Sequence, residues 1–75
     1  MELGIEYRVV RERLYRRELG SYLSYGIVAV GADKKAAYIP DISTEEWKVA
    51  NLADKLNRLG ASLTHFLDIV EDSLD

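Results

Sequence analysis

The sequence contains no cysteine and only one histidine, His65. Without cysteine, the chain can form neither a disulfide nor a thiolate metal site. His65 has no second histidine as a partner, and the carboxylate at the most useful spacing is Asp68. We therefore interpret His65 as a surface or capping residue, and we expect no metal ion and no other cofactor.

Long hydrophobic runs are absent as well. The longest, from Ile27 to Val30, lies between two glycines and is far shorter than the ~20 apolar residues that cross a bilayer. The chain starts Met1-Glu2-Leu3-Gly4, without the basic region and apolar stretch of a signal peptide. These features predict a cytoplasmic protein that does not insert into a membrane.

Catalytic motifs are also missing. Gly26 and Gly31 have the spacing of a phosphate loop, but Ala32-Asp33 stand where that loop needs lysine followed by serine or threonine. An aspartate at this point would repel phosphate. The adjacent acids Glu45-Glu46 and Glu71-Asp72 do not face each other on a helix, so they do not form an acid–base pair. The sequence therefore predicts a protein that is not an enzyme and has no small-molecule substrate.

Length and charge give the first positive indications. The 75 residues form one domain, residues 1–75, and so short a chain buries only about 60% of its unfolded surface. Small domains without disulfides often gain stability from a second subunit, which makes a homodimer one hypothesis. The net charge is −3, with five arginines within residues 8–17 and mostly acids from residue 41 onward. The two halves could attract each other within one molecule or between two.

The first segment of the chain is ambiguous. In residues 5–16, apolar and charged residues alternate from Ile5 to Val9, which fits a strand, whereas Val10 and Leu14 could lie on one side of a helix. We favour the strand because a turn signal and a second strand-like segment come directly after it in the chain.

The next segments have the pattern of two more strands. The turn signal at residues 18–21 precedes residues 22–30, which are rich in β-branched and aromatic side chains. A second turn at 31–35 leads to a short third strand at 36–39, which we expect to end at Pro40 because proline cannot donate a ladder hydrogen bond. The three strands should form an antiparallel meander.

The second half of the chain has the pattern of two helices. Apolar residues recur at helical spacing from Thr44 to about Leu59 and again after Ser62. Gly60 predicts a left-handed end of the first helix, and Ser62 can cap the second. Because the connection is so short, the helices should lie antiparallel as an αα-hairpin. The predicted fold is therefore α+β, with the αα-hairpin packed on one face of the meander.

The junction between the two halves resembles a complete helix start. Ser43 can cap the first free amides while Glu46 reaches back to the Ser43 amide, as in a capping box. Ile42 and Trp47 occupy the two positions of a hydrophobic staple. Trp47 nevertheless lies roughly opposite the apolar stripe of its helix, so part of its ring is expected to be exposed.

The strand at residues 22–30 is apolar on both sides, as expected for a central strand. In so small a protein, the helices can cover one sheet face and leave the other to solvent, to the N-terminal segment or to a partner. The first side carries Leu23, Tyr25, Ile27 and Ala29, and the second carries Tyr22, Val28 and Val30.

The first hairpin carries the clearest functional signal, because arginines and tyrosines interleave there. Positive charge holds phosphate and aromatic rings stack on bases, but the same residue types are enriched in protein interfaces. The chain as a whole is acidic, which favours a protein partner over nucleic acid. The expected contacts are the open sheet face of the hairpin or the exposed side of the first helix, with Arg11, Arg13, Tyr15, Tyr22 and Trp47 as the contact residues.

A sparse sequence pattern supports a family resemblance. The pattern is Y-G-I, then D-I-S, then an asparagine late in a helix, then a histidine followed by D-x-x-E-D; it is carried by Tyr25-Gly26-Ile27, Pro40-Asp41-Ile42-Ser43, Asn57, His65 and residues 68–72. Over residues 25–74, the chain resembles a family of small uncharacterised bacterial proteins, mainly Gram-positive, although Thr64 stands where that pattern has proline. The resemblance implies a fold and a bacterial cytosol, and no activity.

The sequence therefore predicts a small non-enzymatic protein–protein interaction module. It would act as a homodimer, or as an adaptor or inhibitor that docks on a larger protein. The alternative is a nucleic-acid-binding regulator that uses the same arginine- and tyrosine-rich hairpin.

Overall fold

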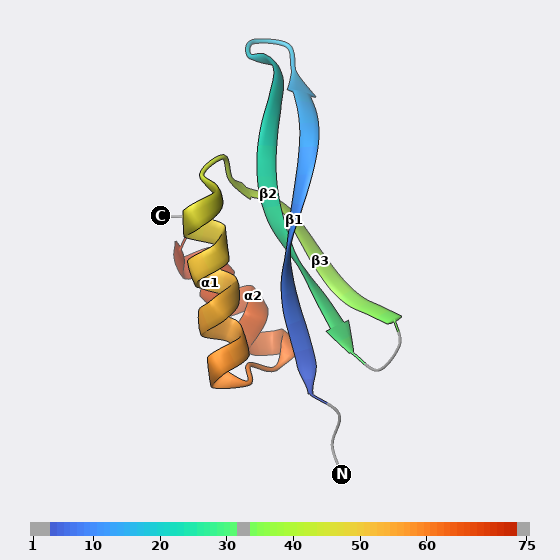
Figure 1. Cartoon of the computed structure of the whole chain (residues 1–75), viewed down its shortest axis with the longest axis vertical. Helices are drawn as coiled ribbons and strands as arrows, with labels where there is room; N and C mark the ends of the chain where they lie inside the picture. Colours follow the sequence, from blue (N-terminus) through green and yellow to red (C-terminus); the bar gives the residue numbers. More distant parts are fainter. Residues whose placement is uncertain (1–3, 32–33, 74–75) are drawn as a thin grey trace.

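The computed structural model describes residues 4–31 and 34–73. Three strands are followed by two helices (Figure 1), namely β1 at Ile5–Arg16, β2 at Gly20–Gly31, β3 at Lys34–Ser43, α1 at Glu46–Leu59 and α2 at Leu63–Ser73. The strands lie in the order β1-β2-β3, and both pairs are antiparallel. The predicted α+β fold, with a three-stranded meander before two helices, is confirmed.

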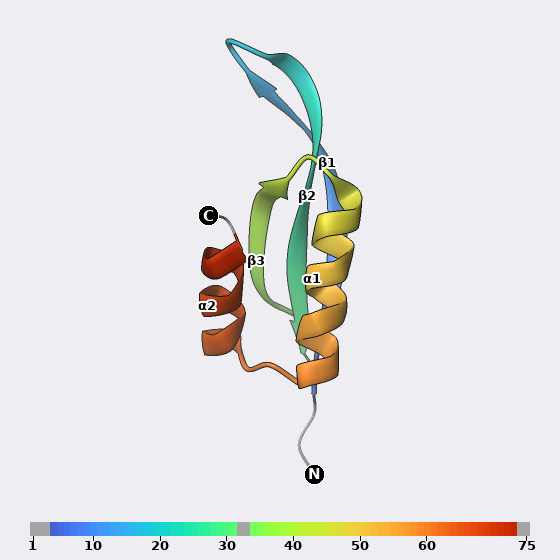
Figure 2. The same ribbon diagram turned by 90° about the vertical axis from the view of Figure 1, so that its left-hand side faces the viewer.

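Both helices lie on the same side of the sheet (Figures 1 and 2), and the core forms between them and the strands. Ile27 of β2, Leu56 of α1 and Phe66 of α2 are fully buried there. The Tyr7 ring of β1 lies 4.9 Å from the Phe66 ring, and its hydroxyl donates a 2.6 Å hydrogen bond to the Ala61 carbonyl. One tyrosine thus joins the first strand to the start of the second helix.

The opposite side of the sheet carries no helix in the part of the chain that the structure describes (Figure 1). Tyr22, Val28 and Val30 are half-buried, so the apolar second side of β2 is not enclosed within one molecule. A shallow depression of about 350 Å³ lies on this side, with Val28 and Tyr38 among its lining residues. The sheet therefore has one covered and one open face, as predicted.

The ambiguous first segment is a strand with the predicted bounds. Its register with β2 runs without a shift from Ile5 opposite Gly31 to Arg16 opposite Gly20. In a strand, alternate side chains point to the same face, so Tyr7 can lie against the core. A helix over the same residues would not have placed Tyr7 there. Gly20 has a φ of 73°, a left-handed conformation that glycine adopts at no steric cost.

The far part of the first hairpin projects from the body of the protein. The pairing of β2 with β3 ends at Tyr25 opposite Ser43, so beyond this point β1 and β2 pair with each other alone. We term residues 11–25 the arm. It extends past the helices in Figure 1, and its strands exchange sides between body and arm in both views, as in a strongly twisted two-stranded ribbon. The molecule is accordingly elongated, at 48 × 26 × 18 Å.

The third strand is longer than predicted. We expected residues 36–39 ended by Pro40, but β3 continues through this proline to Ser43. Proline is tolerated because β3 is an edge strand and the register of β2 and β3 shifts between Tyr25 and Ile27. Of the predicted turn at 31–35, residues 32–33 lie outside the described residues.

The predicted capping box at the start of the first helix is wrong. Because the chain stays extended through Ser43, α1 begins at Glu46 with Glu45 as its N-cap residue, and that N-cap makes no side-chain capping bond. The Ser43 hydroxyl instead accepts a 3.0 Å hydrogen bond from the Glu45 amide. The later helix start also takes Ile42 and Trp47 out of the two staple positions.

The predictions for the connection between the helices are confirmed. Gly60 is left-handed, with a φ of 61°, and the next amide, Ala61, donates to the Leu56 carbonyl at 3.1 Å. The Ser62 hydroxyl accepts a 3.3 Å hydrogen bond from the His65 amide and so caps α2. Within the described ranges, neither helix has the length and apolar character needed to span a membrane.

An asparagine closes the outer edge of the sheet beside the helices. The Asn57 side chain accepts a hydrogen bond from the Tyr7 amide at 2.8 Å and donates one to the Tyr7 carbonyl at 2.9 Å. β1 is an edge strand, and exposed edges offer unpaired backbone groups to other chains. The amide of Asn57 therefore takes the place of a neighbouring strand at this point.

Candidate functional site

The arm exposes large apolar side chains to solvent. Tyr15 is 73% exposed, Leu19 67% and Leu23 41%. Single exposed apolar residues are ordinary, but a group of them on one projecting element indicates a contact surface. The neighbouring arginines Arg11 and Arg13 are exposed as well.

The strand register brings most of these residues to one side of the arm. Arg11 lies opposite Tyr25, and Arg13 lies opposite Leu23. Because side chains two residues apart point to the same side of a strand, Tyr15 lies on that side too. Arg11, Arg13, Tyr15 and Leu23 therefore form one surface, which we term the arm patch. Leu23 was missed as a contact residue, although its alternation with Tyr25 was visible in the sequence.

The prediction that the open sheet face carries all four hairpin residues is wrong. The arm patch lies on the side of the strands that carries Tyr7 and Ile27 and faces the helices, and only Tyr22 lies on the open side. Tyr22 lies opposite Leu14 and points to the other side of the ribbon, because its position has the opposite parity. Its hydroxyl accepts a 3.0 Å hydrogen bond from Arg16 Nε and lies 3.3 Å from Asp41 Oδ2, to which it donates. Tyr22 is therefore occupied by contacts within the protein.

Asp41, near the end of β3, joins this strand to the arm. Its backbone has a φ of 56°, a left-handed conformation that aspartate and asparagine tolerate better than most residues. Its carboxylate accepts hydrogen bonds from Ser24 Oγ at 2.5 Å and Arg16 Nη2 at 3.3 Å. The bond from Ser24 is the main cause that lowers the pKa of Asp41, and together with the Arg16 and Tyr22 bonds it outweighs the opposite effect of partial burial.

A second tyrosine–carboxylate pair lies on the open sheet side. The Tyr38 hydroxyl donates a 2.5 Å hydrogen bond to Glu12, and the Lys35 amine lies 5.6 Å from the centre of the Tyr38 ring. Burial, together with the bond to Glu12, raises the pKa of Tyr38 to about 12. Tyr38 therefore stays protonated at neutral pH and serves as a fixed donor rather than as an acid–base group.

Trp47 is exposed, but it lies on α1 and not on the arm. Its side chain is 60% exposed, and its indole N–H donates a 3.1 Å hydrogen bond to Glu45. Lys48 lies 5.7 Å from the indole ring centre and forms a 3.1 Å ion pair with Glu45. The structure thus places the fifth predicted contact residue in a small polar cluster of its own.

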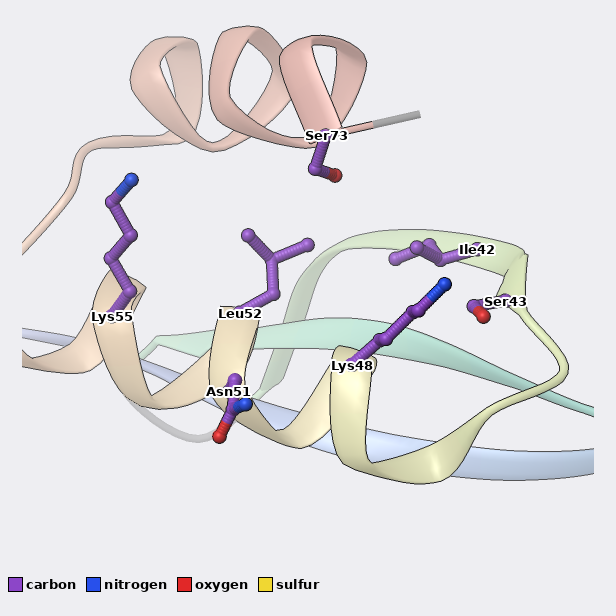
Figure 3. A pocket seen from close by; sticks show the side chains of 7 residues that line it. All are labelled: Ile42, Ser43, Lys48, Asn51, Leu52, Lys55 and Ser73. Carbon is purple, nitrogen blue, oxygen red and sulfur yellow. The ribbon is translucent and has the colours of Figure 1, made fainter. Parts of the chain in front are cut away.

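Sequence reasoning missed a groove between the two helices. A cavity of about 470 Å³ lies between α1, α2 and the end of β3 (Figure 3). Lys48, Leu52 and Lys55 share one side of α1 and reach into it, and Ser73 of α2 lies across from them. The spacing of these three α1 residues was visible, but a groove exists because the helices stand apart on the sheet (Figure 2) rather than against each other.

The structure also places the residues that the sequence offered for catalysis or metal binding. His65 is exposed, and the Ser62 hydroxyl beside it is engaged by the His65 amide. Within residues 4–31 and 34–73, no group of three or more histidine, aspartate or glutamate side chains is placed to hold a metal ion.

Comparisons with known proteins give a family and no activity. A model of a family of unknown function (DUF6514) matches residues 1–75, the whole chain. No curated protein and no solved structure matches it. Since the family model covers every residue, the chain belongs to DUF6514, a family of unknown function.

Proposed function

We propose that this protein is a small non-enzymatic interaction module, an adaptor or inhibitor that docks on a larger protein through the arm patch. The observation that carries the proposal is an arm that projects beyond the body and exposes Tyr15, Leu19 and Leu23. None of the described buried apolar residues lies between residues 10 and 23, so the arm contributes little to the core. Its apolar side chains are better explained by contact with another molecule.

The charges of the arm indicate what kind of surface it would contact. Among the described residues, Arg11, Arg13 and Arg17 make no ion pair, whereas Arg16 pairs with Asp41. Arginine and tyrosine are the residue types that most often dominate binding energy at protein interfaces. The complementary partner surface would be acidic, with room for the Tyr15 ring and the Leu23 side chain.

On the basis of the family resemblance, we also propose that the protein acts in a bacterial cytoplasm.

Three residues of the resemblance pattern have structural roles in this fold. Gly26 allows the close approach of β3, Asp41 binds the base of the arm and Asn57 closes the edge of β1. The pattern is therefore compatible with a shared scaffold whose contact residues lie elsewhere.

Capture of a partner from the host lysate tests the proposal. Arg13→Glu should abolish capture of any protein that the native chain retains. The matched control is Arg58→Glu, which reverses a charge on α1, where Arg58 pairs with Asp54 at 3.0 Å. Capture that survives Arg13→Glu, or that is lost equally with Arg58→Glu, would contradict docking through the arm patch.

A homodimer is a second form of the same proposal, with a second copy as the partner. Sedimentation at two protein concentrations tests it, because a dimer must dissociate on dilution. An unchanged monomer mass at high concentration would reject the homodimer while leaving docking on another protein intact.

Nucleic acid is the alternative partner, favoured by the exposed Tyr15 ring between arginines on one ribbon. Titration with mixed-sequence oligonucleotides at two salt concentrations tests it, because phosphate contacts weaken steeply as salt increases. Failure to bind at low salt would remove this alternative.

A further inference from the structure

The backbone of β1 has a free edge along the arm. Tyr7 shows which backbone groups face outward, because its amide and its carbonyl both bond to Asn57 of α1 rather than to β2. In an antiparallel pair, every second residue of an edge strand directs both of its backbone groups away from the neighbouring strand. The orientation of the whole edge can therefore be deduced from Tyr7.

The unbroken register carries this orientation into the arm. β1 and β2 pair without a shift from residue 5 to residue 16, so the backbone N–H and C=O groups of Val9, Arg11, Arg13 and Tyr15 also point outward. Among the described residues, no side chain or backbone group bonds to these groups. The edge is thus closed at Tyr7 and open along the arm, which projects past α1 (Figure 1).

The same residues carry the arm patch. Arg11, Arg13 and Tyr15 have outward backbone groups, and their side chains lie together on one side of the ribbon. A strand added to this edge would form its ladder with the backbone, and its alternate side chains would lie beside the two arginines. Backbone bonds would provide affinity, and the arginines would select the sequence.

Charge argues against a second copy of the chain as the added strand. In an antiparallel pair, outward residues lie opposite outward residues. Two arms centred on Arg11, Glu12 or Arg13 would therefore place arginine opposite arginine, and like charges directly opposite each other destabilise a strand pair. The arm favours a partner with carboxylates in the same alternation.

We propose that the outer edge of the arm binds an extended acidic segment of the partner protein as an additional β-strand. Carboxylates at every second residue lie beside Arg11 and Arg13, and an apolar residue of the segment packs beside Tyr15. The inference rests on the proposed docking function and specifies its binding mode and the chemistry of the partner.

The test uses the full chain and synthetic eight-residue peptides. The probe alternates glutamate with valine, except that the position placed beside Tyr15 carries valine in place of glutamate. One control alternates lysine with valine, and a second is the probe with every second amide N-methylated, in the alternation that blocks the ladder. Hydrogen exchange followed by NMR reports the amides of Val9, Arg11, Arg13 and Tyr15, and peptide titration reports the affinity.

The proposal predicts fast exchange of these four amides in the free protein and at least about tenfold slower exchange with saturating probe. Neither the lysine peptide nor the N-methylated peptide should protect them. Arg13→Glu should weaken binding of the probe about fivefold and permit binding of the lysine peptide, because the cross-strand charge pair is reversed.

Three results would overturn the proposal: slow exchange of these amides in the free protein, equal binding of the lysine or N-methylated peptide, or no protection by the probe. Failure of the strand-addition proposal can be distinguished from failure of the proposed docking function. If the probe fails but Arg13→Glu still abolishes partner capture, the arm binds its partner by side-chain contacts alone. Binding of an oligonucleotide without protection of these amides would assign the arginines to phosphate instead.

Discussion

The side chain of Asn57 holds α1 against the edge of β1. Its carboxamide carries the same donor and acceptor as a peptide unit, and both are used on the Tyr7 backbone. Two residues 50 positions apart are thereby held together, and α1 is docked against the edge of β1. A buried or half-buried backbone group without such a partner is costly, because it loses its bonds to water.

Replacement of Asn57 by alanine should destabilise the protein by about 1–3 kcal/mol, because the Tyr7 amide and carbonyl lose their partners. The measurement is urea unfolding of both proteins. Asn51→Ala is the matched control, since Asn51 is exposed on the same helix, and it should change stability by no more than about 0.5 kcal/mol. Equal effects of the two substitutions would mean that the edge contact contributes nothing.

Asp41 makes stability depend on pH. Its pKa in the fold lies below the ordinary value of 3.8, mainly because Ser24 donates to its carboxylate. A carboxylate with a lowered pKa stabilises the fold fully above its unfolded pKa, and this contribution is lost as the pH falls through the folded pKa.

The free energy of unfolding should therefore differ between the native protein and Asp41→Asn at neutral pH, and the difference should shrink below about pH 4. Unfolding curves recorded from pH 7 down to acid conditions measure it. Ser24→Ala should weaken the pH dependence, because it removes the shortest bond to the carboxylate. A difference that stays constant across the acid range would show that the charge of Asp41 is not the cause.

At the scale of the secondary-structure elements, the close and irregular pairing of β2 with β3 determines where the third strand ends. A Cβ atom at Gly26 would lie 2.8 Å from the Cα of Pro40 and closer still to the Ile39 carbonyl oxygen. The irregular pairing at this point lets β3 pass its proline and continue to Ser43. Because β3 is longer, α1 begins at a later residue than predicted.

Substitution of Gly26 by alanine should destabilise the protein by about 2 kcal/mol or more, because backbone atoms of β3 occupy the space of the added methyl group. Gly4→Ala is the control, since nothing lies within 4 Å of its added Cβ, and it should have little effect. Thermal unfolding distinguishes the two. Equal stability of both variants would show that β3 moves away without loss.

The helix ends show which local signals are reliable. Gly60 and Ser62 act as predicted because each needs only its own neighbours along the chain. Ser43 has a fuller local signature than Ser62, because Glu46 completes a capping box, yet it remains in a strand because its segment pairs with β2. Sheet pairing supplies more hydrogen bonds than one capping contact, and it outweighs the local preference for a helix start.

The molecule as a whole divides into a body that contains the core and an arm that contains almost none of it. Apolar burial joins Tyr7 and Ile27 to the helices, whereas the arm exposes Tyr15, Leu19 and Leu23. An isolated two-stranded ribbon is at best marginally stable, and here Asp41 and Glu12 link its base to the rest of the sheet.

The body should therefore fold without the tip of the arm. Replacement of residues 13–23 by Asn-Gly joins Glu12 to Ser24, which lie directly opposite each other, through a two-residue turn that suits a hairpin. Cooperative unfolding should remain, and stability should change by less than about 2 kcal/mol, because the lost contacts are an exposed ion pair and a few hydrogen bonds. Circular dichroism during thermal unfolding measures this.

The same shortened protein should lose the binding assigned to the arm patch. If it fails to fold, the arm is part of the stabilising structure and its exposed side chains need another explanation. If it folds and still captures the partner, the contact surface lies on the body, where Trp47 and the groove at Lys55 are the next surfaces to test.

Local patterns in the chain were enough to predict the elements and their order, because alternation in β1, the helical stripes of Val49, Leu56, Phe66 and Val70, and the signals at Gly60 and Ser62 act over a few residues. Other features required the folded arrangement. The end of β3, the helix start at Glu46 and the separation of Tyr22 from the arm patch depend on the register between strands, and the groove depends on how two helices share one sheet face. Strand register and helix packing depend on contacts between residues far apart in the chain, so the local sequence pattern cannot predict them.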